Sequence, residues 1–463
     1  MHTLSQGWRT RALKQQLKAQ FKHLLTLALL GASLGALAQP AAEVIGEVEF
    51  SHGAGIAQMP GQAPRTLGKG LQLQEGDRLS TAEGATAIFK MRDGTRMTLR
   101  PNTEMVLQKY HFDGKASDNS MVLQLLNGGF RALTGLISKD APNAAKIQTP
   151  GATIGVRGTD FDARLCGPEC KAEAAKVTEK TRPNAVQASA KLILAKGDIN
   201  AIDGAGATRK LVDGASVYPG ETVQTAARAG GVLIFRDESR MTLGANTRFK
   251  VDSFVFDDKN PSDGRFLVSL VGGSMRALTG VIGKSDKRNV GFTTPTATIG
   301  IRGTGLDLDC AAVGSCSFFT WLGSIAVTPL GQTAEQVLET GQGLFVGRDG
   351  IRPLTAPTLD ELQRPDSVPV NMEQLFSSGG VSPEDQGLYV YVRDGHIEIT
   401  TLTDTLHLGR GETGYAGLDG RTGRPGETPA FIQFDGVPLP NSFNPMLLNL
   451  LSEIGKASSN QCR

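Results

Sequence analysis

Two related stretches organise this chain: TPGATIGVRGTDFDA at 149–163 and TPTATIGIRGTGLDL at 294–308. Further landmarks align in the same order when the sequence is shifted along itself by about 145 positions, which indicates a duplication. We predict that the first copy spans 43–170 and the second 190–346. The other aligned pairs include FKMRDGTRMTLRPNTE (89–104) with FRDESRMTLGANTR (235–248), and GGFRALTGLISK (128–139) with GSMRALTGVIGK (273–284).

Each copy is predicted to consist of short β-strands. Apolar and polar residues alternate on both sides of an Asn-Thr turn in RMTLRPNTEMVLQKYHF (96–112) and in RMTLGANTRFKVDSFVF (240–256). A smaller unit of strand, glycine turn and strand recurs at 192–224, 324–346 and 389–416. Such units suit coils of short strands that stack on each other and bury their faces together. The fold class is therefore all-β.

The N-terminal segment carries a targeting signal. Residues 1–23 contain several Arg and Lys and no acid, and an apolar run follows from Leu24 to Ala38. Ala36-Leu37-Ala38 matches the small-x-small cleavage pattern, so we expect a secretory signal peptide (1–38) that is cut after Ala38. The alternative is an uncleaved membrane anchor, for which the run is shorter than the roughly 20 residues that a bilayer requires.

Four further segments connect or follow the two copies. A helix is expected at EAAKVTEK (173–180) in the first of them, and an amphipathic helix at NPMLLNLLSEIG (444–455) in the last. The segments are a connector (171–189), a Pro-rich linker (347–387), a small C-terminal β unit (388–436) and a tail with a short helix (437–463).

The repeated stretch does not match a catalytic or phosphate-binding motif. GATIGVRG has neither the Walker A spacing nor the dinucleotide spacing, and a strand-like segment follows it instead of a helix N-terminus. Arg157, Asp160 and Asp162 could form a catalytic set, but the second copy has Gly305 in the place of Asp160. A reaction that needs two flanking carboxylates would lose one of them in that copy.

Charge and composition narrow the classes of partner. The 463 residues carry 48 Lys and Arg against 46 Asp and Glu, so the net charge is +2. This balance does not favour nucleic acid or an anionic membrane as a partner. The six histidines lack metal-binding spacing, and no nucleophile motif occurs. We therefore predict no catalytic residue, no metal site, no cofactor and no small-molecule substrate.

The repeated stretch is better interpreted as a strand with a special backbone position. Ile154 and Val156 alternate with Gly155 and Arg157, and Gly158 would allow a bulge or a close backbone approach. Arg157 and Arg302 would need partners if they were partly buried, such as backbone carbonyls or the carboxylates Asp162 and Asp307. The structural signature comprises Gly155, Arg157, Gly158 and Thr159 in the first copy, and Gly300, Arg302, Gly303 and Thr304 in the second.

Both copies resemble the FecR domain. The similarity lies in the signature stretches and in the upstream order G-D-R-L-S-T, R-D-G-T-R-M-T-L and N-T-E, and it covers roughly 44–165 and 192–310. The resemblance implies two tandem, β-solenoid-like domains without a catalytic residue that can be transferred. FecR itself is a transmembrane regulator that relays the occupancy of an outer-membrane transporter to a sigma factor. With a signal peptide and no internal transmembrane segment, this chain is more similar to stand-alone periplasmic FecR-domain proteins.

Four of the five cysteines form two close pairs that follow the signature stretches. Cys166 and Cys170 follow the first stretch, and Cys310 and Cys316 follow the second. An oxidising compartment favours one local disulfide in each copy, whereas neither copy supplies the four ligands of a closed zinc site. Cross-pairing, such as Cys166 with Cys310, remains open from the sequence alone. Cys462 would then be a free thiol or an intermolecular link.

These observations favour a periplasmic, non-enzymatic interaction or signalling module. We expect it to bind an envelope protein through strand edges or rim loops. A second hypothesis is binding to peptidoglycan or another envelope polysaccharide, which usually requires exposed aromatic rings. Outside the predicted signal peptide the only tryptophan is Trp321, and we expect Tyr389 and Tyr391, which alternate on one predicted strand, to pack across the sheet. The third hypothesis, an enzyme, lacks a coherent set of residues.

Overall fold

The computed structural model describes residues 43–114, 118–140, 144–176, 181–301, 303–310, 314–359, 361–382 and 385–432. Within these ranges most residues lie in β-strands, as the sequence predicted. The predicted signal peptide, the signature residue Arg302 and the C-terminal tail with Cys462 lie outside the described residues.

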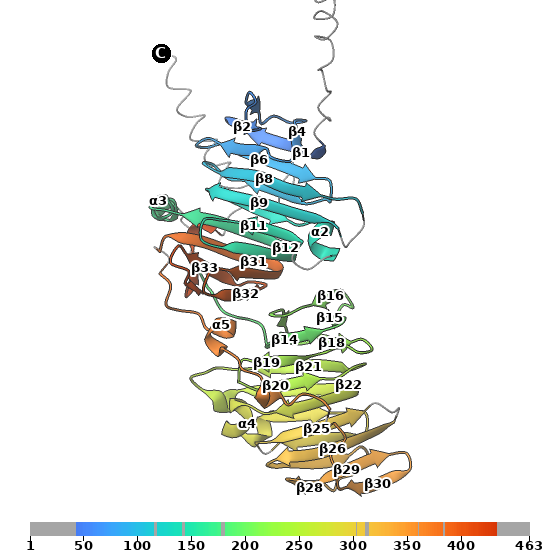
Figure 1. Cartoon of the computed structure of the whole chain (residues 1–463). Coiled ribbons are helices and arrows are strands. Elements are labelled where there is room, and N and C mark those ends of the chain that lie inside the picture. The colour runs from blue at the N-terminus through green and yellow to red at the C-terminus, as the bar shows by residue number, and fades with distance from the viewer. Residues whose placement is uncertain are drawn as a thin grey trace, which may run out of the picture. The chain divides into compact units, whose positions relative to one another are not determined.

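Two large sheets hold most of the strands, and each contains one of the two copies (Figure 1). The first sheet contains β1 (Val44–His52), β2 (Gly55–Gln58), β3 (Arg65–Thr66), β4 (Gln72–Gln74), β5 (Arg78–Thr81), β6 (Thr86–Met91), β7 (Arg96–Leu99), β8 (Glu104–His111), β9 (Ser120–Asn127), β10 (Gly129–Leu133), β11 (Ala145–Gln148), β12 (Thr153–Cys166), β31 (Gly387–Thr400), β32 (Thr405–Gly409), β33 (Thr413–Gly417) and β34 (Thr422–Gly423).

The second sheet begins after the connector. It contains β14 (Ala190–Lys196), β15 (Ile199–Ile202), β16 (Thr208–Leu211), β17 (Ser216–Val217), β18 (Thr222–Thr225), β19 (Gly230–Phe235), β20 (Arg240–Leu243), β21 (Arg248–Val255), β22 (Arg265–Leu278), β23 (Val290–Thr293), β24 (Ala297–Ile301), β25 (Gly305–Cys310), β26 (Ser315–Leu322), β27 (Ser324–Pro329), β28 (Gln336–Glu339), β29 (Gly343–Gly347) and β30 (Gly350–Leu354).

Helices are short and lie between strands. The α-helices are α2 (Leu136–Asp140), α3 (Glu169–Lys176), α4 (Val281–Ser285) and α5 (Met372–Phe376), and the 3₁₀ turns are η2 (Pro261–Asp263), η3 (Lys287–Asn289), η4 (Pro365–Ser367) and η5 (Ala430–Ile432). The helix expected at 173–180 overlaps α3, which begins earlier, and residues 177–180 lie outside the described residues. The helix expected at 444–455 also lies outside them. A two-stranded ribbon pairs β13 (Arg182–Pro183) with β35 (Glu427–Thr428).

The predicted alternation positions the core. In β8, Met105 and Leu107 are buried while Glu104 and Val106 are partly exposed, because successive side chains of a strand point to opposite faces. Asn102 and Asn246, in the predicted Asn-Thr turns, have φ of +54° and +53°, a conformation that asparagine tolerates better than most residues. Each sheet thus buries its own apolar cluster.

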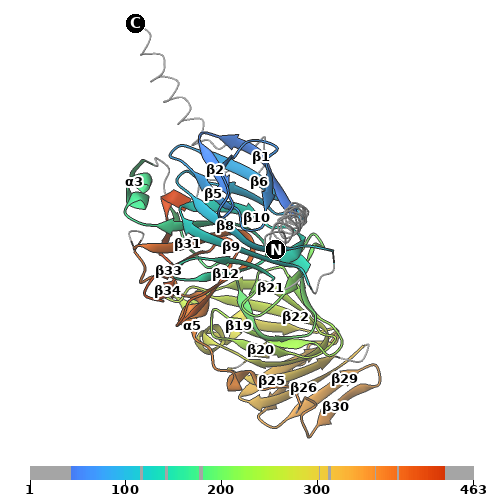
Figure 2. The same ribbon diagram turned by 45° about the horizontal axis from the view of Figure 1, so that its top comes forward.

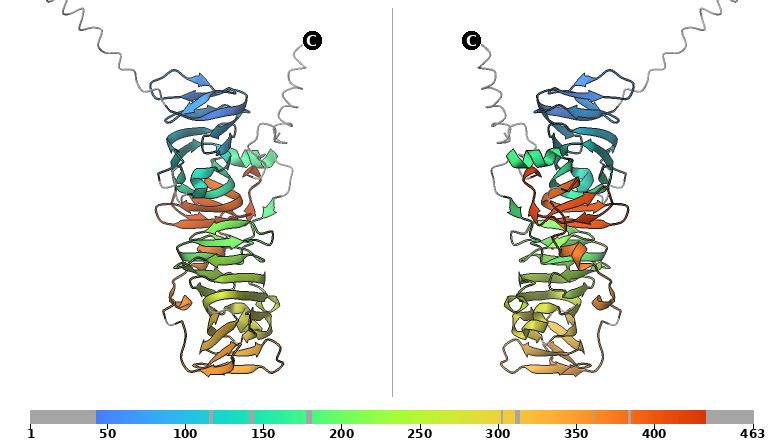
Figure 3. Two further views of the ribbon diagram at one scale, coloured as in Figure 1. Left: turned by 90° about the vertical axis from the view of Figure 1, so that its right-hand side faces the viewer. Right: turned by 90° about the vertical axis from the view of Figure 1, so that its left-hand side faces the viewer.

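The C-terminal strands belong to the first sheet and do not form a separate unit. β31 pairs antiparallel with β12, in register from Thr153 opposite Thr400 to Cys166 opposite Gly387. Figure 1 and Figure 2 show β31 beside β12, with β33 next to β31, and Figure 3 shows these C-terminal strands (orange to red) below the strands of the first copy from two sides. Leu388, Val390 and other apolar residues of this segment enter the first core. The first copy is therefore completed by strands that follow the second copy in sequence.

The Pro-rich linker packs along the second sheet. Val368 and Leu375 are buried against Val232 and Ile234 of β19. The Arg240 guanidinium donates a hydrogen bond of 2.8 Å to the Val368 carbonyl, which attaches the linker to β20. The segment expected as a linker therefore supplies buried contacts on its way back to the first sheet.

Candidate functional site

The two signature threonines fasten the same backbone positions in both copies. Thr159 N donates to Thr134 Oγ1 at 2.7 Å, and Thr159 Oγ1 donates to the His396 carbonyl at 2.9 Å. In the second copy, Thr304 N donates to Thr279 Oγ1 at 2.9 Å, and Thr304 Oγ1 donates to the Ser324 carbonyl at 2.7 Å. In each copy the signature threonine therefore holds three chain segments together through equivalent hydrogen bonds.

The signature glycines allow backbones to approach closely there. Gly158 and Gly303 have φ of +59° and +74°, and the β12–β31 register shifts between Arg157 and Asp160. A Cβ on Gly395 would lie 2.6 Å from the Gly158 carbonyl oxygen, and a Cβ on Gly323 would lie 2.6 Å from the Gly303 carbonyl oxygen. Such distances leave no room for a side chain. This equivalence aligns β31 with β26–β27.

The remaining signature residues take ordinary strand positions. Gly155 lies opposite Lys146 of β11 and Glu398 of β31, and Gly300 lies opposite Gly291 and Ala326. Arg157 is half-buried, and burial lowers its pKa while the carboxylates Glu398 and Asp213 act against that shift. The acids that influence Arg157 are thus not the neighbouring Asp162 that the sequence suggested.

The copies differ in their buried charge pairs. In the first copy, Arg131 donates to both Asp160 oxygens at 3.0 and 2.7 Å, and Arg393 of β31 donates to Asp162 at 2.6 Å. In the second copy, Arg276 donates to both Asp307 oxygens at 2.8 and 2.9 Å. Two-pronged Arg–carboxylate pairs of this kind fix geometry as well as charge.

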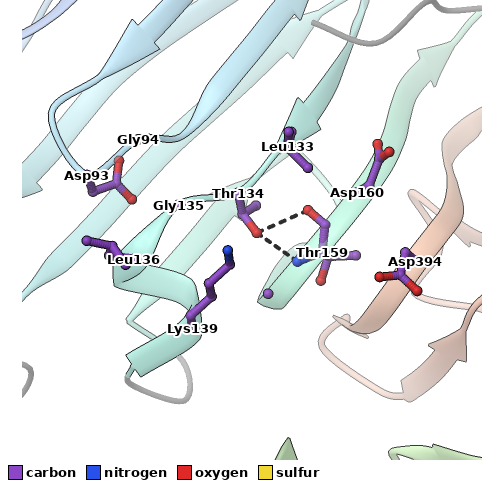
Figure 4. Close-up of a pocket in the computed structure, with 11 residues that line it drawn as sticks. Asp93, Gly94, Leu133, Thr134, Gly135, Leu136, Lys139, Thr159, Asp160 and Asp394 are labelled. Atoms are coloured by element: carbon purple, nitrogen blue, oxygen red, sulfur yellow. Dashed lines mark hydrogen bonds between the residues drawn. The ribbon is translucent and has the colours of Figure 1, made fainter. Parts of the chain in front are cut away.

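A pocket of about 330 Å³ lies beside the signature of the first copy (Figure 4). It is bounded by the β6–β7 turn, the end of β10, α2, the Gly158 bulge and β31. Its lining residues are Asp93, Gly94, Leu133, Thr134, Gly135, Leu136, Lys139, Gly158, Thr159, Asp160 and Asp394. No sequence motif marks Leu133, Leu136, Lys139 or Asp394, and Asp394 comes near the other three only because β31 pairs with β12.

The acids of the pocket have different roles. Asp93 is buried and accepts hydrogen bonds from Thr95 N, Thr95 Oγ1 and Ile137 N at 3.1, 2.8 and 3.4 Å. Asp160 is held by Arg131, whereas Asp394 and Lys139 are exposed charges. Leu133 is 37 % exposed and Leu136 is 49 % exposed. The pocket therefore presents apolar surface with charges at its rim, which suits binding.

The second copy has an aromatic ring where the first copy has the Asp160 side chain. Gly305 aligns with Asp160, and Trp321 aligns with Arg393 through the matching hydrogen bonds of His396 and Ser324. A Cβ on Gly305 would overlap the Trp321 ring. The Arg364 guanidinium lies 4.3 Å from the centre of the same ring. The loss of one carboxylate is thus accompanied by an aromatic ring in its place.

Both local disulfides are present. Cys166 is bonded to Cys170 and Cys310 to Cys316, so cross-pairing between the copies does not occur. Two disulfides indicate an oxidising compartment outside the cytoplasm. Among the described residues, no helix is long and apolar enough to cross a membrane, and no group of three His, Cys, Asp or Glu could hold a metal ion.

The duplicated all-β fold with its repeated signature defines the class, and comparison with known proteins names the family. The model of the family described as FecR protein matches residues 77–179 and 221–325. These residues belong to the FecR family, so the chain carries two FecR regions. No curated protein is found to be similar to the chain. Two crystal structures of a "putative anti-sigma factor" from Parabacteroides distasonis match at 14 % identity and a TM-score of 0.24, covering 29 % of this chain and 59 % of that protein.

Proposed function

We propose that this protein is a non-enzymatic signalling module of the bacterial envelope that binds a protein partner through the pocket of its first copy. In this proposal the copies are solenoid-like domains, 43–170 and 190–346, and the mature chain works in the periplasm after cleavage behind Ala38. The two FecR regions and the two disulfides support a role in the envelope.

One observation carries the proposal: the first copy has a pocket beside its signature that is lined by Asp160, whereas the second copy has the Trp321 ring against Gly305, which replaces that acid. Leu133 and Leu136 are more exposed than most residues of their type, and Asp394 and Lys139 provide charges of both signs beside them. A partner side chain that filled the pocket would bury apolar surface and gain orientation from the charged rim. Binding in the first copy then leaves the second as a scaffold.

The pocket offers little for bond breaking. Asp93 is occupied by backbone and threonine donors, and Asp160 is neutralised by Arg131, so neither acid is placed as a general base. The aromatic rings considered for polysaccharide binding are also engaged: Tyr389 is buried against Tyr415 and Phe431, with ring centres 5.1 and 5.2 Å apart. These contacts favour a protein partner over a sugar polymer.

Site-specific photo-crosslinking in the native cell tests the proposal. A photoreactive residue at Leu136 of α2 should give a discrete adduct with one envelope protein. The matched control is Val281 of α4, which occupies the same place in the second copy and should give none. The double variant L136D/D394K should fold but form no complex with the protein identified in that adduct. Equal adducts from both positions, or retention of the purified chain on peptidoglycan sacculi, would contradict the proposal.

A further inference from the structure

The face of the first sheet that carries the signature arginine is packed against the second copy. Arg157 lies opposite His396, and Glu398 lies opposite His407 of β32 on the same face. A Cβ on Gly214, between β16 and β17, would overlap the His407 ring. A Cβ on Gly409 would likewise overlap the Ser216 hydroxyl. Residues 213–218 of the second copy therefore lie directly on β32, and we call this contact the junction.

A fully buried ionic group adjoins the junction. Lys191 Nζ of β14 lies 3.2 Å from Glu412 Oε1, and Arg424 Nε lies 3.1 Å from Glu412 Oε2, with all three side chains inaccessible to solvent. Arg424 also donates to the His407 carbonyl at 2.5 Å. Lys191 is in β14 of the second sheet, and Glu412 lies between β32 and β33 of the first sheet, so opening the junction would separate a buried ion pair.

Two histidine rings stack inside the junction, and three of their four ring nitrogens have no hydrogen-bond partner. The rings of His396 and His407 are 5.5 Å apart and inclined by 24°. His396 is 6 % exposed, and neither of its ring nitrogens has a hydrogen-bond partner. The Nδ1 atom of His407 also lacks one, although it lies 4.0 Å from a Glu398 oxygen. Imidazolium needs acceptors for both N–H groups, so these rings pack as neutral groups.

The charges around the rings oppose protonation. Burial lowers the pKa of His396 well below its usual value, and His407, Lys191, Arg157 and Arg209 lower it further. Burial also lowers the pKa of His407, against the opposing effect of Glu398 and Asp213. Tyr218, whose ring packs beneath Arg410, has its pKa raised to about 12 by burial and stays neutral. Burial and three cationic side chains thus outweigh the two acids.

We propose that His396 and His407 make the junction an acid-sensitive contact between the two copies, which opens when the compartment acidifies. Above about pH 6.5 the rings are neutral in either state, and the closed junction has its full stability. Below that pH, protonation in the open state draws the equilibrium towards opening. Each histidine that gains its proton only on opening raises the open population about fivefold in the first pH unit below 6.5, and by up to about tenfold per unit at lower pH. Glu412, whose pKa is lowered by Lys191 and Arg424 despite burial, keeps its charge in this range.

Hydrogen exchange followed by mass spectrometry on the mature chain tests this proposal. The opening constant, corrected for the intrinsic exchange rate, should rise about five- to thirtyfold between pH 6.5 and pH 5.5 in β32 and in residues 213–218, for one or two histidines of ordinary open-state pKa. It should stay constant in β24, which lies away from the junction. His396→Phe should reduce the slope by about one proton. His111→Phe is the control, because His111 is half-exposed beside Asp113, and it should behave as the wild type.

Two results would overturn the proposal. The first is an opening constant that does not change with pH in the wild type, or one that keeps its full slope in H396F/H407F. The second does not depend on any variant: if the His396 ring proton, followed by NMR in the wild type, titrates near pH 6.5 without exchange broadening, the junction admits the charge and has no acid sensitivity.

Discussion

Glu412→Gln should be among the most damaging conservative substitutions in this protein. The change keeps the shape of the side chain but removes the only negative charge between Lys191 and Arg424 in the buried ionic group described above. Removing one partner of a buried ion pair leaves an uncompensated charge and costs about 3–5 kcal/mol. Lys191 can reduce this cost by losing its proton, because burial already lowers its pKa to about 8. We therefore expect about 3 kcal/mol at pH 7, the lower end of the range.

The pH dependence of this loss distinguishes the buried charge from a packing defect. A lysine whose pKa is lowered to about 8 is charged at pH 7 and largely neutral at pH 9, so the wild type itself has less of the pair to lose at pH 9. The destabilisation should therefore be smaller at pH 9 than at pH 7. Urea unfolding followed by circular dichroism measures it at both values. Asp198→Asn, in an exposed pair with Lys210, is the control and should cost under about 1 kcal/mol. Equal effects of the two substitutions would refute the reasoning.

Two further substitutions test the backbone and the disulfides. Gly280→Ala should lower the free energy of unfolding by roughly 1–3 kcal/mol in a urea titration, because its Cβ would overlap the Asp237 carbonyl. The control is Gly204→Ala, which has open space around it and should be nearly neutral. Similar values for both substitutions would contradict this packing. Replacing Cys310 and Cys316 together by Ser should lower the free energy of unfolding by about 2 kcal/mol, because a loop of this length constrains the unfolded chain only modestly. Under reducing conditions the wild type and the variant both lack the bond and should have similar stability. A much less stable variant under those conditions would show that the serines harm the fold directly.

The sequence was sufficient for everything that depends on local pattern. Alternation identified the strands, and the ordered landmarks at a shift of about 145 residues identified the duplication. The proximity of the cysteines favoured two local disulfides but left cross-pairing open. The sequence did not predict which strands far apart in the chain pair with each other. The alternating segment at 387–400 predicts a strand, but nothing in it indicates that this strand pairs with β12, more than two hundred residues earlier. The strands of the predicted small C-terminal β unit therefore join the first sheet, a pairing that the sequence did not indicate.

The same limit explains the candidate site. Arg157 and Asp162 are close in sequence and looked like partners, yet Asp162 accepts from Arg393, which only β31 brings near, and Arg157 faces Glu398 and Asp213. The sequence alignment of the two copies identifies Gly305 as the counterpart of Asp160, and in the sequence alone this difference only disfavours catalysis. That Trp321 covers the position could not be deduced, because the equivalence of Trp321 with Arg393 depends on two strand connections of very different length.

The divergence between the copies is informative because their backbones agree so closely. Thr159 and Thr304 make the same hydrogen bonds, and Gly395 and Gly323 approach the same carbonyls, so the supporting scaffold relies on backbone groups and on residues that have no alternative. Side chains that this scaffold does not use are free to differ, and they differ together: an acid and an arginine in the first copy become a glycine and a tryptophan in the second. A scaffold that needed the acid for its own stability would not hold in both forms. The surface beside the signature is therefore where the two copies can acquire separate roles, one as a binding surface and one as its support.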